Sequence, residues 1–87
     1  MFDLKDMAKK LMSQRYQQRT LHKRVSDMKK RCNNAKYYNS LNKLSDVDLA
    51  KTEAIYNHLV VESDIVNKDI ARLEAQIVAT VLDMYRE

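Results

Sequence analysis

The sequence contains no glycine, no proline and no tryptophan among its 87 residues. Tight β-hairpin turns need residues that tolerate positive φ, and β-sandwiches place glycine and proline in many of their turns. An α-helix needs neither residue, and the leucine, lysine and arginine that are frequent here are good helix formers. The composition therefore predicts an all-α protein.

Cysteine is almost absent as well, because Cys32 is the single one in the chain. One cysteine excludes an intramolecular disulfide framework and favours a reducing compartment. The longest apolar runs, such as residues 77–82, are far too short to span a bilayer. Asp3 and Asp6 interrupt the apolar residues at the N-terminus, unlike the apolar region of a signal peptide. We expect a soluble, cytoplasmic protein in which residues 1–87 form one domain.

Apolar residues follow a heptad pattern in both halves of the chain. The inward positions of the first half are Leu4, Met7, Leu11, Gln14, Gln18, Leu21, Val25, Met28, Cys32 and Ala35. Those of the second half are Leu49, Thr52, Tyr56, Leu59, Ser63, Val66, Ile70, Leu73, Ile77, Thr80 and Met84. The pattern predicts a long antiparallel two-helix hairpin that resembles a coiled coil.

Four asparagines lie between Cys32 and Asp46, at positions 33, 34, 39 and 42. They leave open whether the first helix frays near Asn34 or continues to Leu41. Ser45, with Asp48 three residues later, is typical of a helix N-cap. We expect a first helix over about residues 2–41, a turn over about 42–46 and a second helix over about 46–86.

Charge is divided unevenly along the chain. Residues 1–44 contain twelve Lys or Arg against three Asp, whereas residues 45–87 contain four against nine Asp or Glu. Folding the chain about Ser45 and Asp46 aligns five complementary pairs at the edges of the seam. The five pairs are Lys10–Asp83, Arg15–Glu74, Arg24–Asp69, Arg31–Glu62 and Lys36–Glu53. A register one heptad shorter aligns only Arg24–Glu62 and Lys29–Glu53, so the longer register is favoured.

The second helix is close to apolar all round, which predicts that it is buried on more than one side. A single helix–helix seam also buries too little apolar surface to offset the chain entropy lost on folding. We therefore expect a homodimer or another protein partner to complete a helical bundle. The candidate interface residues on the outer face are Ala54, Val61, Ile65, Ala75, Val78 and Leu82.

Tyr37 and Tyr38 fall at the tip of the expected hairpin. Exposed aromatic side chains at such a tip are plausible hot spots for a protein partner. The alternative is that they pack the turn, and the sequence does not separate these two interpretations.

Basic residues with an interleaved tyrosine lie along the outer face of the first helix. This Lys/Tyr stripe consists of Lys9, Tyr16, Arg19, Lys23 and Lys30. Lysine and arginine bind phosphates, and tyrosine stacks on unpaired bases. Nucleic-acid binding through the stripe is the alternative hypothesis to protein binding, and a solvated helix face is the simpler interpretation.

The remaining polar residues favour structural roles. His58 and Glu62 are spaced like two metal ligands, but no further pair joins them. Cys32 falls at an inward heptad position, which favours a buried thiol over a nucleophile. Gln14 and Gln18 interrupt the apolar seam, as residues that specify helix register do. We expect no catalytic residue, metal, cofactor or small-molecule substrate.

In general architecture the expected hairpin resembles the small helical-hairpin chaperones and adaptors of bacterial secretion systems, and small phage-encoded inhibitors of host proteins. The resemblance implies a protein-binding role, and it rests on shape without a shared motif. The sequence therefore predicts a non-enzymatic adaptor, chaperone or inhibitor.

Overall fold

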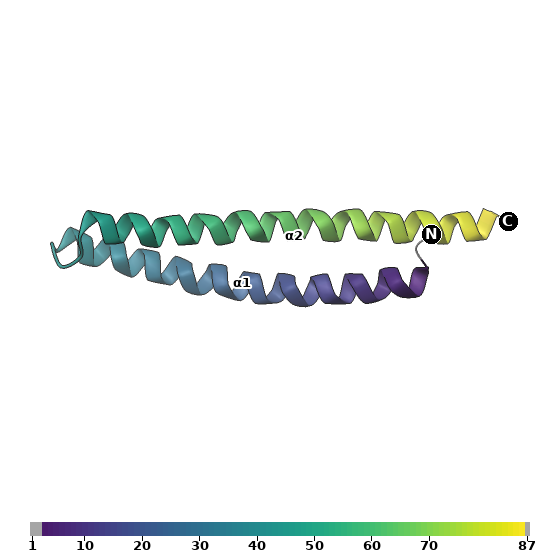
Figure 1. The fold of residues 1–87 in the computed structure, drawn as a ribbon, viewed down its shortest axis with the longest axis horizontal. Helices are drawn as coiled ribbons and strands as arrows, with labels where there is room; N and C mark the ends of the chain where they lie inside the picture. The colour runs from purple at the N-terminus through teal and green to yellow at the C-terminus, as the bar shows by residue number, and fades with distance from the viewer. Residues whose placement is uncertain (1–2, 87) are drawn as a thin grey trace.

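The computed structural model describes residues 3–86 and contains two long α-helices. Helix α1 runs over Leu4–Ser40 and helix α2 over Asp46–Arg86, and no strand is present within these described residues. The helices lie antiparallel and form a rod with extents of 68 × 16 × 14 Å (Figure 1). The predicted all-α hairpin is therefore confirmed. The start expected for the first helix, at residue 2, lies outside the described residues.

The turn between the helices is built by asparagine side chains and backbone. Helix α1 continues through Asn34, so the fraying alternative is wrong, and it ends at Ser40. Asn42 then takes a left-handed conformation with φ of 59°. The N–H of Asn42 donates to the Asn39 carbonyl at 3.0 Å, and that of Lys43 donates to the Tyr38 carbonyl at 2.9 Å. This is the pattern of a Schellman motif, with asparagine in the place glycine usually takes.

Helix α2 begins with the N-cap that the sequence predicts. Ser45 Oγ accepts a hydrogen bond from the Asp48 N–H at 3.2 Å. Asp46 and Asp48 lie in the first turn, where the positive end of the helix dipole stabilises carboxylates. Asn39 of α1 donates from Nδ2 to the Leu44 carbonyl at 2.9 Å and to Asp46 Oδ1 at 2.8 Å. One side chain thus joins the end of α1 to the start of α2.

The core is a single seam between the helices. Every residue that the structure buries within the range 3–86 occupies a predicted inward heptad position. These residues are Met7, Leu21, Cys32, Ala35, Ser63, Val66, Ile70 and Leu73. Leu21, Val66 and Ile70 form its central cluster, with Leu11 and Leu59 packed against it. No side chain in this part of the chain is less than 2% exposed, so the seam is thin.

Two of the five predicted ion pairs between the helices are present. Arg15 Nη2 lies 2.9 Å from Glu74 Oε1, and Lys36 Nζ lies 4.0 Å from Glu53 Oε1. The other three are not formed within residues 3–86, so that part of the prediction is wrong. They are Lys10–Asp83, Arg24–Asp69 and Arg31–Glu62.

The observed register is close to the shorter of the two that the sequence allows, so the prediction of the longer register is wrong. Arg24 lines the same hollow as Glu62, the partner expected in the shorter register. Because α1 ends at Ser40 and α2 begins at Asp46, the hairpin folds about the middle of the turn, closer to Lys43 than to Ser45. The Arg15 and Lys36 side chains are long enough to reach Glu74 and Glu53 across the remaining offset, so these two pairs still form.

Candidate interaction surfaces

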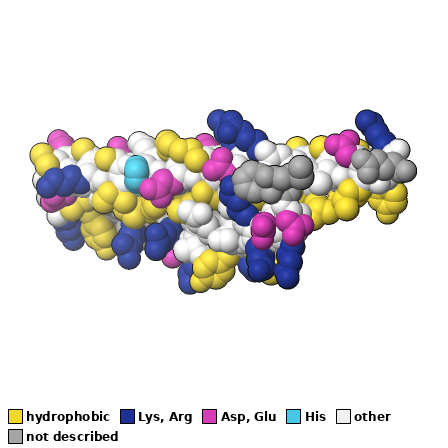
Figure 2. Space-filling view, turned by 45° about the vertical axis from the view of Figure 1, so that its right-hand side comes forward, with side chains coloured by type: hydrophobic (Ala, Val, Ile, Leu, Met, Phe, Trp, Pro, Cys, Tyr) yellow, Lys and Arg dark blue, Asp and Glu magenta, His cyan; other side chains and the backbone are white. Residues whose placement is uncertain are grey.

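The outer face of α2 comprises the six predicted interface residues Ala54, Val61, Ile65, Ala75, Val78 and Leu82, all of which are exposed. The large side chains among them keep more than half of their surface accessible: Val61 55%, Ile65 54%, Val78 57% and Leu82 52%. The buried residues of α2 point toward α1, so α1 covers none of this face. Hydrophobic side chains reach the surface along the length of the molecule (Figure 2).

The tip of the hairpin exposes a second apolar group. Tyr37 and Tyr38 contact each other edge to face, with ring centroids 5.7 Å apart and an angle of 65° between the rings. Both are exposed, as are Leu41 in the turn and Val47 in the first turn of α2. The backbone carbonyls of both tyrosines accept hydrogen bonds from the turn, and the rings remain accessible to solvent. The tip thus combines an ordered backbone with accessible aromatic surface.

The Lys/Tyr stripe lies on α1, and all five of its residues are exposed. Within residues 3–86, none of its Lys or Arg residues forms an ion pair. Lysine and arginine side chains project from the α1 side of the molecule in Figure 2. The acidic side chains of α2 that do pair with α1, Glu53 and Glu74, meet Lys36 and Arg15 instead, so the stripe keeps its positive charge.

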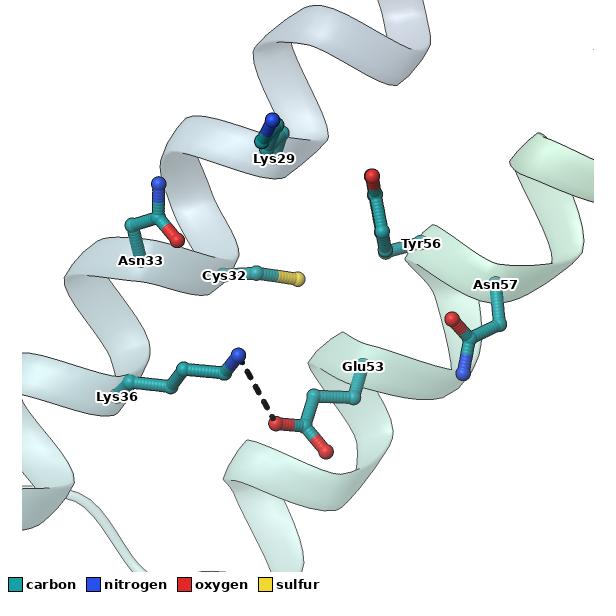
Figure 3. A pocket seen from close by; sticks show the side chains of 7 residues that line it. All are labelled: Lys29, Cys32, Asn33, Lys36, Glu53, Tyr56 and Asn57. Atoms are coloured by element: carbon teal, nitrogen blue, oxygen red, sulfur yellow. Dashed lines mark ion pairs between the residues drawn. The ribbon is translucent and has the colours of Figure 1, made fainter.

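A hollow of about 380 Å³ opens beside Cys32, between α1 and α2. It is lined by Lys29, Cys32, Asn33, Lys36, Glu53, Tyr56 and Asn57, and the Cys32 sulfur points toward α2 (Figure 3). Cys32 is 5% exposed, and its Sγ donates to the Thr52 carbonyl at 3.5 Å. No histidine is among the residues that line the hollow. The thiol packs in the seam, as its heptad position predicts.

The side chains of His58 and Glu62 pair with each other. His58 Nε2 lies 2.8 Å from Glu62 Oε1 across one turn of α2. Within residues 3–86, no group of three or more His, Cys, Asp or Glu residues gathers as metal ligands would. In the same part of the chain, neither helix contains a segment long and apolar enough to cross a membrane.

The two seam glutamines differ in their surroundings. Gln18 Nε2 donates to Asn67 Oδ1 at 2.6 Å, which joins the two helices through a polar pair. Gln14 Oε1 is buried and accepts no hydrogen bond. The Gln18 contact fits the predicted role in setting register, whereas Gln14 leaves an acceptor unsatisfied.

Some exposed apolar residues were absent from the predicted interface. Val47 and Ile55 are 64% and 53% exposed, and Met12, Met84 and Tyr85 are also accessible. Met84 was predicted to occupy an inward position of the seam, and its exposure of 63% shows that this is wrong. In Figure 1, α2 extends beyond the start of α1, so the end of α2 has no neighbour among residues 3–86. The offset between the helix ends depends on the register of the two helices, and the charge pattern predicted a different register.

Comparison with known proteins identifies no relative: no family model, no curated protein and no solved structure matches this chain.

Proposed function

We propose that this protein is a non-enzymatic protein–protein interaction module of the adaptor, chaperone or inhibitor type. It binds its partner through the outer face of α2 and through the hairpin tip at Tyr37 and Tyr38. The observation that carries the proposal is the exposure of Val61, Ile65, Val78 and Leu82 on the side of α2 that faces away from α1. Large apolar side chains left exposed on one helix face are typical of an interaction site.

The thin seam supports the same proposal. Burial of apolar surface is the main favourable term in folding and in association. One seam between two helices leaves much of α2 exposed to water, and a partner on its outer face removes that surface. Partner binding also stabilises the folded hairpin by mass action.

A photo-cross-linking amino acid at position 61 tests the proposal in the native host. Position 12 is the matched control, because Met12 is also an exposed apolar residue, 71% accessible, but lies on α1. We expect a covalent adduct with a polypeptide from position 61 and none from position 12. A folded protein that gives no adduct from position 61 or from position 82 contradicts the proposal.

A second function has one specific observation in its favour, which is the unpaired positive charge of the Lys/Tyr stripe. Lys9, Arg19, Lys23 and Lys30 contact phosphates in this alternative, and Tyr16 stacks on unpaired bases. Such binding relies on backbone charge and is therefore steeply salt dependent. Recovery of the protein's partners with and without nuclease separates the two functions, since a protein complex survives nuclease treatment.

A further inference from the structure

We propose that a second copy of this chain covers the outer face of α2, with the two α2 helices packed antiparallel about a two-fold axis midway between Asp64 and Lys68. The proposal rests on the protein-binding function above and names the partner of that same face. Its first support is charge. Asp64 and Lys68 are both exposed on the side away from α1, and neither forms an ion pair within residues 3–86.

The antiparallel alignment satisfies charges at its centre and at its ends. Placing Asp64 of one copy opposite Lys68 of the other fixes the alignment along the whole helix. The same alignment puts Asp46, in the first turn of α2, opposite Arg86 in its last turn. By symmetry each of these pairs occurs twice. A parallel two-fold arrangement would instead place Asp64 against Asp64 and Lys68 against Lys68, and like charges in contact disfavour association.

Side-chain size is complementary in the same alignment. Val61 falls opposite Ala71, and Leu82 falls opposite Ala50, so a large exposed side chain meets a small one in these two layers. Each of these four residues is three or four positions from Asp46, Asp64, Lys68 or Arg86. Residues with this spacing lie on the same face of an α-helix. Alternation of large and small residues lets two helices approach closely and pack without voids.

The exposed area of the chain exceeds what one standard dimer interface buries. The chain exposes 7109 Å², whereas a compact protein of this mass exposes about 5,400 Å². The excess is roughly 1,700 Å² per chain, about twice the 800 Å² that each partner contributes to a standard interface. Helix α2 alone is about 60 Å long, which provides the required contact length.

Two charge variants test the alignment by sedimentation equilibrium. Asp64→Lys places lysines opposite Lys68 in both symmetric contacts, and Lys68→Asp places aspartates opposite Asp64. We expect each variant alone to dimerise roughly tenfold more weakly than the unmodified protein. Both substitutions are on exposed positions, so helicity measured by circular dichroism should not change. An equimolar mixture of the two variants should dimerise again, because the introduced charges then face opposite charges.

The mixing result isolates contacts between chains. Each single variant loses the same contacts within its own helix whether it is alone or mixed, so recovery in the mixture comes only from pairing across the interface. The combined Asp64→Lys and Lys68→Asp protein should likewise dimerise as a single species. Variants that dimerise as tightly as the unmodified protein, or a mixture that stays weak, overturn the antiparallel alignment. A mass of one chain for the folded, unmodified protein at micromolar concentration overturns the dimer itself.

The cross-link at position 61 separates failure of this inference from failure of the proposed function. An adduct with twice the mass of the chain supports self-association. An adduct with a different polypeptide, together with a monomeric purified protein, overturns self-association and leaves the interaction function standing. Absence of any adduct contradicts both.

Discussion

Arg15 and Glu74 are 59 positions apart in the sequence, yet Arg15 Nη2 and Glu74 Oε1 lie 2.9 Å apart across the helix seam. Their side chains are 56% and 47% exposed, so solvent screens the pair. Exposed ion pairs contribute about 0.2–1 kcal/mol. The contact therefore reports the alignment of the helices more than it stabilises them.

The first prediction tests that alignment. Arg15→Glu should lower the free energy of unfolding by up to about 1 kcal/mol, because two carboxylates then face each other. Adding Glu74→Arg should restore most of the loss in urea denaturation. The Arg24 and Asp69 swap is the control, since this pair is not formed, and its double-mutant coupling should be within about 0.3 kcal/mol of zero. Strong coupling there, with none at Arg15 and Glu74, would restore the longer register.

The second prediction concerns the thin core. Ile70 is 6% exposed and packs in the central cluster with Leu21 and Val66. Ile70→Ala should cost about 2–5 kcal/mol, because the loss of buried methyl groups leaves a cavity. Thermal unfolding followed by circular dichroism measures this. Met12→Ala, at a position 71% exposed, should change stability by less than about 0.5 kcal/mol. Equal losses at the two positions would refute the assignment of the core.

The third prediction contrasts the two seam glutamines. Gln14→Leu should raise the free energy of unfolding by about 1 kcal/mol, because it removes a buried acceptor that has no donor. Gln18→Leu should lower it by a similar amount, because Asn67 Oδ1 then loses its donor. Chemical denaturation of both variants decides the matter. Changes of the same sign would mean that the two glutamines share one environment.

The fourth prediction concerns the turn. Asn42 has φ of 59°, a conformation in which a β-carbon is unfavourable and asparagine is tolerated. Asn42→Ala should therefore destabilise the hairpin by about 1 kcal/mol, and Asn42→Gly should be neutral or stabilising. The same urea titration compares the two variants. A loss caused by glycine equal to that caused by alanine would point to the Asn42 side chain rather than to its backbone.

The fifth prediction separates the two candidate functions. Under the protein-binding proposal, a mobility-shift assay at about 0.15 M salt, near physiological ionic strength, should show no tight binding of nucleic acid. Lys23→Glu with Lys30→Glu reverses two charges of the Lys/Tyr stripe without touching the seam. Lys51→Glu, which reverses an exposed charge on α2, is the control. Tight binding that Lys23→Glu with Lys30→Glu abolishes and Lys51→Glu preserves would place nucleic-acid binding first.

Heptad periodicity predicted the core well, because burial in a two-helix seam depends mainly on which face of each helix a residue occupies. Leu21, Cys32, Val66 and Ile70 are all buried at predicted positions. Exposure of Val61 and Leu82 also follows from the same periodicity. Whether a partner covers them is a property of two molecules, which one chain's pattern only suggests.

Register was predicted less well, because its main signal was surface charge. Lysine and arginine side chains are long enough to pair across several alignments, as Arg15 and Lys36 do here. The turn decided the alignment instead. Asn39 and Asn42 set where α1 ends, through side-chain hydrogen bonds and a left-handed backbone that heptad spacing does not encode.

The single covalent connection at the turn makes the two ends of the rod energetically unequal. Contacts near Asn39 and Asp46 close a loop of a few residues, whereas contacts near Met7 and Leu73 close nearly the whole chain, at a larger entropic cost. Local opening therefore begins at the end of the rod opposite the turn and progresses toward the turn. Amide protons should exchange fastest in the last turns of α2. Any molecule that binds around Val78 and Leu82 thus acts on the part of the hairpin that separates most readily, and it restrains the opening of the whole rod.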